Sequence, residues 1–149
     1  MVILFSVLIF SFLNFRKKAV CFAGDVGSVS IALIVLFLLF KLIISTSNPV
    51  YILLLVIYGI DTGVTLFIRL KNGDNIFNPH REHLYQKIVD ISKWSHIRVS
   101  LLYSFIQLAI NFIVVYFLSM SDMKYFLSSL IIFILYFSYT FVKNKLVKK

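Results

Sequence analysis

Charged residues are scarce in this chain. Lysine, arginine, aspartate and glutamate make up 14% of its 149 residues, whereas they account for about 25% of a typical soluble domain. Hydrophobic residues make up 60%, and the mean hydropathy is +0.96. A soluble fold would lack the polar residues needed to cover its surface, so the composition predicts an integral membrane protein.

Cysteine and acidic residues are also few. The single cysteine, Cys21, cannot form an intrachain disulfide and says nothing about the redox compartment. Six acidic residues against fifteen basic ones leave a formal net charge of +9, a balance that often indicates nucleic acid. Here the basic residues lie in short segments between apolar runs, which favours membrane orientation and no nucleic-acid partner. The sequence also contains no Walker loop, G-x-S-x-G motif or H-E-x-x-H motif.

Long apolar segments predict an all-α, polytopic membrane helix bundle that forms one domain over residues 1–149, with about five transmembrane helices. The last three segments have the length needed to cross a hydrocarbon core about 30 Å thick. The second is shorter, but Lys41 can extend toward the interface. The first is also interpreted as a membrane helix, the tail of a longer one cut at Met1. The segments are approximately Val2–Phe15, Val29–Ile44, Val50–Leu70, Val99–Leu118 and Tyr125–Val142.

The distribution of basic residues predicts the orientation. Thirteen of the fifteen, Lys143 among them, fall in alternate loops and the C-terminal tail, and only Lys41 and Lys124 do not. The positive-inside rule then places the N-terminus outside and the C-terminus in the cytoplasm. Residues 24–28 and the loop 71–97 therefore share the cytoplasmic face. The aromatic residues of the last two segments are expected to face lipid or the interfaces.

The segment Gly24-Asp25-Val26-Gly27-Ser28 lies between a basic cluster, residues 16–18, and the second apolar run. Two glycines beside a carboxylate allow the backbone to approach a charged ligand, such as a metal ion or a phosphate. Asp25 or Ser28 could instead cap a helix that begins at Val29. The two interpretations are compatible, because a helix N-terminus also favours anions.

Asp61 lies inside the third apolar segment. A carboxylate at that depth costs at least about 2.5 kcal/mol on insertion scales, so it is expected to face the bundle interior and to have a partner. One interpretation is a buried hydrogen bond to Thr62, Thr65 or a neighbouring helix. The other is a functional carboxylate that lines a polar cavity open to the cytoplasm.

The loop 71–97 contains the sequence PHREHLYQ at residues 79–86. His80 and His83 are three residues apart, a spacing that places them on one face of a helix. With Arg81 they form a set of donors suited to a phosphate or diphosphate. The same spacing also suits a transition metal, although no third ligand supports a closed zinc site. A basic loop in contact with anionic lipid is the remaining interpretation.

Taken in order, these motifs resemble the C-terminal half of the polyprenyl-phosphate N-acetylhexosamine-1-phosphate transferases (glycosyltransferase family 4). The resemblance covers Leu4 to about Asn111 and rests on FAGDVGS at residues 22–28 and PHREHLYQ at residues 79–86. The spacing of the second motif, with the segment from Ile60 to Leu70, is most similar to the O-antigen and capsule branch. Members of this family are multi-pass proteins of the bacterial inner membrane that work on its cytoplasmic face.

The resemblance implies transfer of a sugar-1-phosphate, of the N-acetylhexosamine type, from a UDP-sugar to undecaprenyl phosphate, which starts a cell-envelope polysaccharide such as lipopolysaccharide. Asp25 would be catalytic and a ligand of Mg²⁺. Asp61 matches the family without a defined role. The substrate-binding residues would be Gly24, Gly27, Ser28, His80, Arg81 and His83.

The chain departs from the family in length and in acidic residues. The family is roughly twice as long, and its first half supplies an adjacent aspartate pair and an Asn/Asp-rich loop that have no match here. One carboxylate, Asp25, supplies few of the oxygen ligands that a Mg²⁺ site needs. The chain is therefore expected to need an N-terminal half of the same enzyme or a homodimer partner. The alternative is a catalytically inactive remnant or a small membrane scaffold protein.

Overall fold

The computed structural model describes residues 2–15, 20–21, 23–76, 78 and 81–147, without the side chains of Asp25 and Val147. The described residues are helical and contain no strand, which confirms the all-α part of the prediction. They form two compact units, residues 1–46 and 47–149, and each is described by itself. The helices are α1 (Val2–Asn14), α2 (Gly24–Thr46), η1 (Pro49–Leu55), α3 (Val56–Asn72), α4 (Leu84–Ser92), α5 (His96–Ile113), η2 (Val114–Leu118) and α6 (Lys124–Val147).

Four stretches of the described chain are long and apolar enough to cross a membrane: Val26–Thr46, Pro49–Asn72, His96–Leu118 and Lys124–Leu146. Large apolar side chains on them are exposed, with Phe105 75% and Phe133 66% accessible. Exposed phenylalanines in such helices suit contact with lipid tails. The first apolar segment forms α1, which has 13 residues and is shorter than these four.

The first unit contains α1 and α2, and here one prediction is wrong. The sequence placed the helix start at Val29, but α2 begins at Gly24, so residues 24–28 form its first turn. Gly24 has a φ of +62°, a conformation that glycine adopts without steric cost. The Ser28 hydroxyl donates to the Gly24 carbonyl at 2.8 Å and does not cap a helix at Val29. The motif's backbone is therefore helical. The basic residues 16–18 and Phe22 lie outside the described part.

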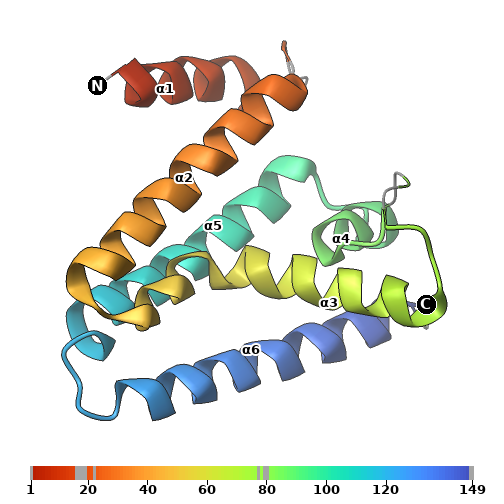
Figure 1. Cartoon of the computed structure of the whole chain (residues 1–149). Coiled ribbons are helices and arrows are strands. Elements are labelled where there is room, and N and C mark those ends of the chain that lie inside the picture. The colour runs from red at the N-terminus through yellow and green to blue at the C-terminus, as the bar shows by residue number, and fades with distance from the viewer. Residues whose placement is uncertain (1, 16–19, 22, 77, 79–80, 148–149) are drawn as a thin grey trace. The chain divides into compact units, whose positions relative to one another are not determined.

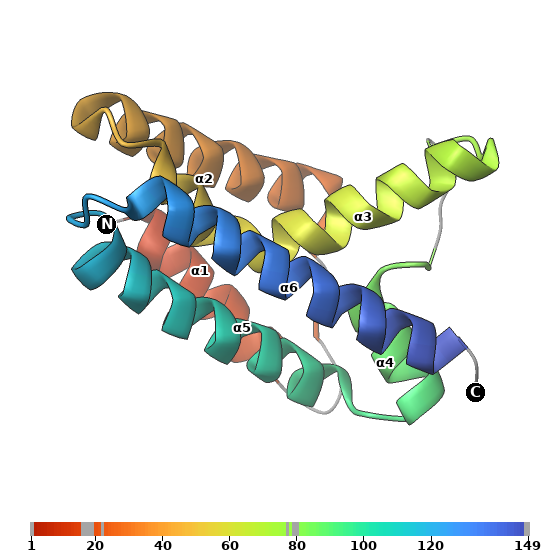
Figure 2. The ribbon, with the colours of Figure 1, turned by 90° about the horizontal axis from the view of Figure 1, so that it is seen from below.

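The second unit is a bundle of η1–α3, α5–η2 and α6, with the short helix α4 packed against it. α6 contacts both α3 and α4, and α4 also contacts α5 (Figure 1). Viewed from below, α6 runs along the bundle between α3 and α5 (Figure 2). The loop 71–97, expected to be the main soluble segment, therefore returns to the bundle and contributes a helix to it.

One end of this bundle is held by an apolar core. The core joins Leu53 of η1 to Val114 of η2, which are 1% and 0% exposed. Leu127 and Ile131 of α6 pack against it. The buried polar groups of the unit lie mainly toward the other end of α3, where α4 docks.

The side chain of Gln107, on α5, bonds to backbone groups at the junction of η1 and α3, where the regular helical hydrogen bonding is interrupted. The 3₁₀ turn ends at Leu55, where φ is −125° and the regular helical hydrogen bonds are interrupted. The Gln107 side chain accepts from the Ile57 N–H at 2.9 Å and donates to the Leu53 carbonyl at 3.1 Å. Unpaired backbone groups inside a hydrocarbon core cost several kcal/mol, so a side chain from a neighbouring helix allows the span to break there.

We predict that Gln107→Leu destabilises the second unit by about 1–3 kcal/mol, because the Ile57 N–H loses its side-chain acceptor and the Leu53 carbonyl keeps only the Val56 N–H as a donor. Equilibrium unfolding in detergent micelles measures the change. Phe105→Leu, on an exposed face of the same helix, is the matched control and is expected to change stability by less than about 0.5 kcal/mol. Equal effects of the two substitutions would contradict this role of Gln107.

Candidate functional site

The Asp61 carboxylate is the centre of a buried polar cluster. Asp61 lies midway along the span Pro49–Asn72 and is 3% exposed. Counting back from Asn72 at about 1.5 Å per residue, it is about 16 Å from the end of α3. Placing a carboxylate at that depth in a membrane costs free energy, so the side chain is expected to be buried within the protein and hydrogen-bonded.

Five groups in the described chain lie within hydrogen-bond distance of this carboxylate, and they come from α4, α5 and α6 and from the residue that precedes α4. The partners are the Leu84 N–H (2.9 Å), the Tyr139 hydroxyl (3.0 Å), the Tyr103 hydroxyl (3.3 Å), His83 Nδ1 (3.3 Å) and the Tyr85 N–H (3.5 Å). The carboxylate thus links three helices to α3. Its contacts come from these neighbours, not from Thr62 or Thr65 of its own helix.

Two of these contacts cap α4. The first N–H groups of a helix have no partner within the helix, and the positive end of the helix dipole favours a carboxylate there. Asp61 accepts from the N–H groups of Leu84 and Tyr85, the first two residues of α4. A residue of a membrane span thus caps the first two N–H groups of α4, in addition to the capping box that His83 and Gln86 form.

His83 precedes α4 in an extended conformation, with φ −62° and ψ 145°. Residues 81–83 are not helical, so the prediction that the histidine motif forms one face of a helix is wrong for this part. His80 lies outside the described residues. The His83 side chain is 19% exposed, and its ring stacks on Tyr85 with centroids 5.7 Å apart. The His83 backbone N–H donates to the Gln86 side chain at 3.3 Å.

Lys143 of α6 is joined to Asp61 through a single hydroxyl. The Lys143 ammonium donates to the Tyr139 hydroxyl and to Thr65 Oγ1, both at 3.1 Å, and the Tyr139 hydroxyl donates to Asp61. Lys143 is 7% exposed and Thr65 is 0% exposed. A positive and a negative side chain, both buried in apolar helices, thus lie in one hydrogen-bond network. This lowers the free-energy cost of burying each charge.

Two predictions from the sequence are wrong at this cluster. Lys143 was placed in the C-terminal tail, after the last apolar segment, but it lies inside α6 and is buried. Tyr103 and Tyr139 were expected to face lipid, but they are 7% and 8% exposed and donate to Asp61. Burial next to a carboxylate is more favourable for a phenol than lipid contact, because a buried hydroxyl needs a partner.

Arg69 holds the start of the loop that leads to His83. It is 4% exposed, and its guanidinium donates to the backbone carbonyls of Asn75 (2.6 Å) and Asn78 (3.3 Å). α3 ends at Asn72, and the next residue, Gly73, has a φ of +77° that allows its N–H to reach the carbonyls of the last helical turn. Arg69 and Asp61, eight residues apart on α3, thus attach two points of the same loop.

Arg81 lies on the surface beside α4. Its guanidinium is paired with Asp90 at 3.0 Å, and the two side chains are 65% and 45% exposed. Exposed ion pairs of this kind contribute little, about 0–1 kcal/mol. An incoming phosphate can therefore replace Asp90 as the partner of Arg81 at small cost.

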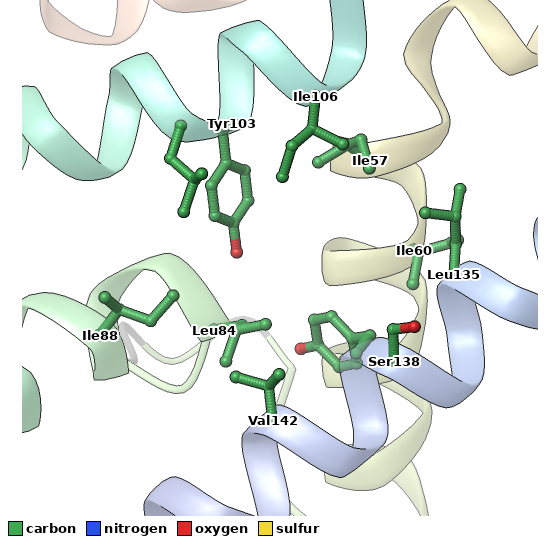
Figure 3. Close-up of a pocket in the computed structure, with 11 residues that line it drawn as sticks. Ile57, Ile60, Leu84, Ile88, Tyr103, Ile106, Leu135, Ser138 and Val142 are labelled. Carbon is green, nitrogen blue, oxygen red and sulfur yellow. The ribbon is translucent and has the colours of Figure 1, made fainter. Parts of the chain in front are cut away.

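An apolar cavity of about 200 Å³ lies between α3, α4, α5 and α6. Ile57, Leu84 and Ile106 are among the side chains that line it, and the Tyr103 hydroxyl points into the space between the helices (Figure 3). A second cavity, of about 160 Å³, is bounded by Tyr58, Tyr85 and Tyr103. Burial, together with the charge of Asp61, raises the pKa of Tyr85, so its phenol remains neutral at ordinary pH.

The described residues contain no group of three or more His, Cys, Asp or Glu side chains placed to hold a metal ion. The Asp61 carboxylate is already surrounded by donors, so it does not fit as a ligand. The side chain of Asp25 lies outside the described set, and Mg²⁺ at that residue stays a prediction.

A spacing of four residues between polar side chains is the feature of the sequence that indicates this cluster. Asp61, Thr65 and Arg69 recur every four residues and are the polar residues buried on α3. Tyr139 and Lys143 are also four apart on α6. Polar residues at this spacing lie on one face of a helix, and two such faces in apolar helices indicate that the helices meet.

Comparison with known proteins adds no relative: no family model, no curated protein and no solved structure matches this chain.

Proposed function

We propose that this chain is the C-terminal half of a polyprenyl-phosphate sugar-1-phosphate transferase, which presents the histidine motif to a sugar-nucleotide diphosphate. The observation that carries the proposal is the attachment of His83 and α4 to Asp61 in a membrane-length helix. A loop that only contacts lipid headgroups has no need of a buried carboxylate to fix its helix. The motifs at residues 22–28 and 79–86 supply the reaction class.

In the proposed reaction an oxygen of the lipid phosphate attacks the β-phosphorus of a UDP-sugar. The bond from that phosphorus to the bridging oxygen breaks, and UMP leaves with the oxygen. The product is a lipid diphosphate that carries the sugar. Arg81 and His83 hold the diphosphate, since cationic and N–H donors suit phosphate oxygens. Mg²⁺ would neutralise the diphosphate charge. Asp25 would be one of its ligands, and the other carboxylate ligands would come from the N-terminal half.

The proposal includes an orientation, with residues 71–97 and the C-terminus in the cytoplasm of a bacterium. Asn75→Cys, introduced in a Cys21→Ser background, tests this. We expect no labelling of the introduced cysteine by a membrane-impermeant maleimide in intact cells and full labelling in inverted vesicles. Ser121→Cys in the same background is the control and is expected to give the reverse pattern. Labelling of the Asn75→Cys variant in intact cells would contradict the orientation.

Reconstitution tests the activity. The chain is co-expressed with an N-terminal half of a family member that contains the aspartate pair, and UMP release is measured with UDP-N-acetylglucosamine and undecaprenyl phosphate. Activity is expected from the pair and from neither half alone, with Asp25→Asn abolishing it. Activity that survives Asp25→Asn unchanged would show that the site assignment is wrong. No activity with any such half would favour a remnant or a scaffold.

A further inference from the structure

The larger cavity, between α3, α4, α5 and α6, is open on one side. Leu102 and Ile106 of α5 and Val142 of α6 line it, and these side chains are 39%, 37% and 40% exposed. Their exposure places the opening between α5 and α6, which both belong to stretches long enough to cross a membrane. In a bilayer the opening therefore faces hydrocarbon chains.

Water does not suit this cavity. A buried water molecule needs about two to four polar partners. The hydroxyls of Tyr103 and Tyr139, which line the cavity, already donate to Asp61, and most of the other lining side chains are apolar. Apolar cavities stay dry and take up apolar ligands, whereas a cavity that stays empty lowers the stability of the fold. A hydrocarbon chain from the bilayer is the filling that fits these walls.

The surface beside the α4 end of the cavity is basic. Leu84 and Ile88 of α4 line the cavity (Figure 3). Lys87, next to Ile88, is close enough to Lys143 of α6 for the two charges to act on each other. Residues 81–98 contain four lysines and arginines against two aspartates and glutamates. A basic surface of this kind at a membrane attracts anionic headgroups.

We propose that the larger cavity binds one acyl chain of an anionic phospholipid, whose headgroup phosphate lies beside Lys87. The apolar walls select the chain, and the basic surface of α4 selects the charge of the headgroup. The occupant is a phospholipid of the bilayer and not the lipid substrate, because the cavity needs a filling whether or not a substrate is bound. The inference does not depend on the proposed function.

Photolabelling of the whole chain tests the proposal. The chain is placed in phosphatidylcholine nanodiscs that contain phosphatidylglycerol with a diazirine on its acyl chain, and labelled residues are identified by mass spectrometry. Leu84, which is 6% exposed and lines the cavity, is expected to be labelled. Phe105, 75% exposed, reports ordinary lipid contact, and Leu53, 1% exposed in the apolar core, is expected to remain unlabelled. Label on Phe105 without label on Leu84 would overturn the proposal, as would equal label on Leu84 and Leu53.

A substitution that fills the cavity gives a second test. Ile106→Trp is expected to abolish the labelling of Leu84 and to leave that of Phe105 unchanged. Leu108→Trp, at a 65% exposed position of the same helix, is the matched control and is expected to change neither. Labelling of Leu84 that persists in a folded Ile106→Trp variant would contradict entry through this cavity. If that variant does not fold, the unaltered chain still decides.

The headgroup is tested by comparing two probes at equal mole fraction. The phosphatidylglycerol probe is expected to label Leu84 about fivefold more than the same probe built on phosphatidylcholine, the effect of about one lysine near the surface. Lys87→Gln is expected to remove this difference, whereas Lys124→Gln, at the other end of α6, keeps it. Equal labelling by the two probes in the unaltered chain would overturn the headgroup assignment. Competition by undecaprenyl phosphate and not by unlabelled phosphatidylglycerol would overturn the phospholipid as the occupant.

Discussion

Asp61→Leu is expected to destabilise the second unit by about 3–5 kcal/mol, the cost of removing one partner of a buried ionic network. The substitution leaves the Lys143 ammonium buried with only hydroxyl partners among its hydrogen bonds. It also leaves the first N–H groups of α4 without their acceptor. Equilibrium unfolding in bicelles, followed by tryptophan fluorescence of Trp94, measures the loss.

Removing the second charge as well is expected to restore much of that stability. Lys143→Met keeps most of the side chain's length and deletes the ammonium, so Asp61→Leu with Lys143→Met should be more stable than Asp61→Leu alone. Lys143→Met alone should cost less than Asp61→Leu, since Lys143 does not bond to Asp61 directly and the hydrogen bonds of the carboxylate are kept. Thr62→Ala serves as control, with an expected change within about 0.5 kcal/mol. A strictly additive double variant would show that the two charges are not coupled.

His83→Ala is expected to lower the kcat of the reconstituted transferase about 10²–10³-fold, the range for loss of one donor aimed at developing charge. His83 is part-buried and its ring is fixed by Asp61 and Tyr85. Initial rates of UMP release at saturating UDP-sugar measure the effect. The fold should be retained, because the Asp61 carboxylate still accepts from the first two backbone N–H groups of α4.

His96→Ala is the matched control for His83. His96 begins α5, is exposed and borders the second cavity, but it is not a hydrogen-bond partner of Asp61. Its replacement is expected to leave the rate within about twofold. A comparable loss at both histidines would indicate general damage to the loop and would remove His83 from the site. Loss at His83 alone would place the motif at the substrate.

The sequence was sufficient for the helical class and for four membrane-length spans, because these follow from local hydropathy and length. It also showed that Asp61 needed a partner. It did not identify the partners, because they lie 22 to 78 residues away in the chain. A contact of that range depends on how α3, α5 and α6 pack, which a hydropathy pattern does not encode.

The predictions that were wrong share a physical cause: each was made from a local property of the sequence. Lys143 was assigned by charge alone and Tyr139 by aromatic character alone, yet each is buried because it belongs to the network around Asp61. The histidine motif was given a helical spacing, but α4 begins one residue after His83, where Asp61 can cap it. The start of α2 was set at Val29, although the small residues before it also adopt helical geometry.

The attachment of His83 to Asp61 has a consequence for depth in the membrane. Because Asp61 lies midway along its span, the height of His83 relative to the bilayer is set by a position on α3 and not by the number of residues between α3 and α4. The contacts of Arg69 with the carbonyls of Asn75 and Asn78 hold the start of the same connection. A change in the number of residues between these two attachments should therefore leave this histidine at the same height.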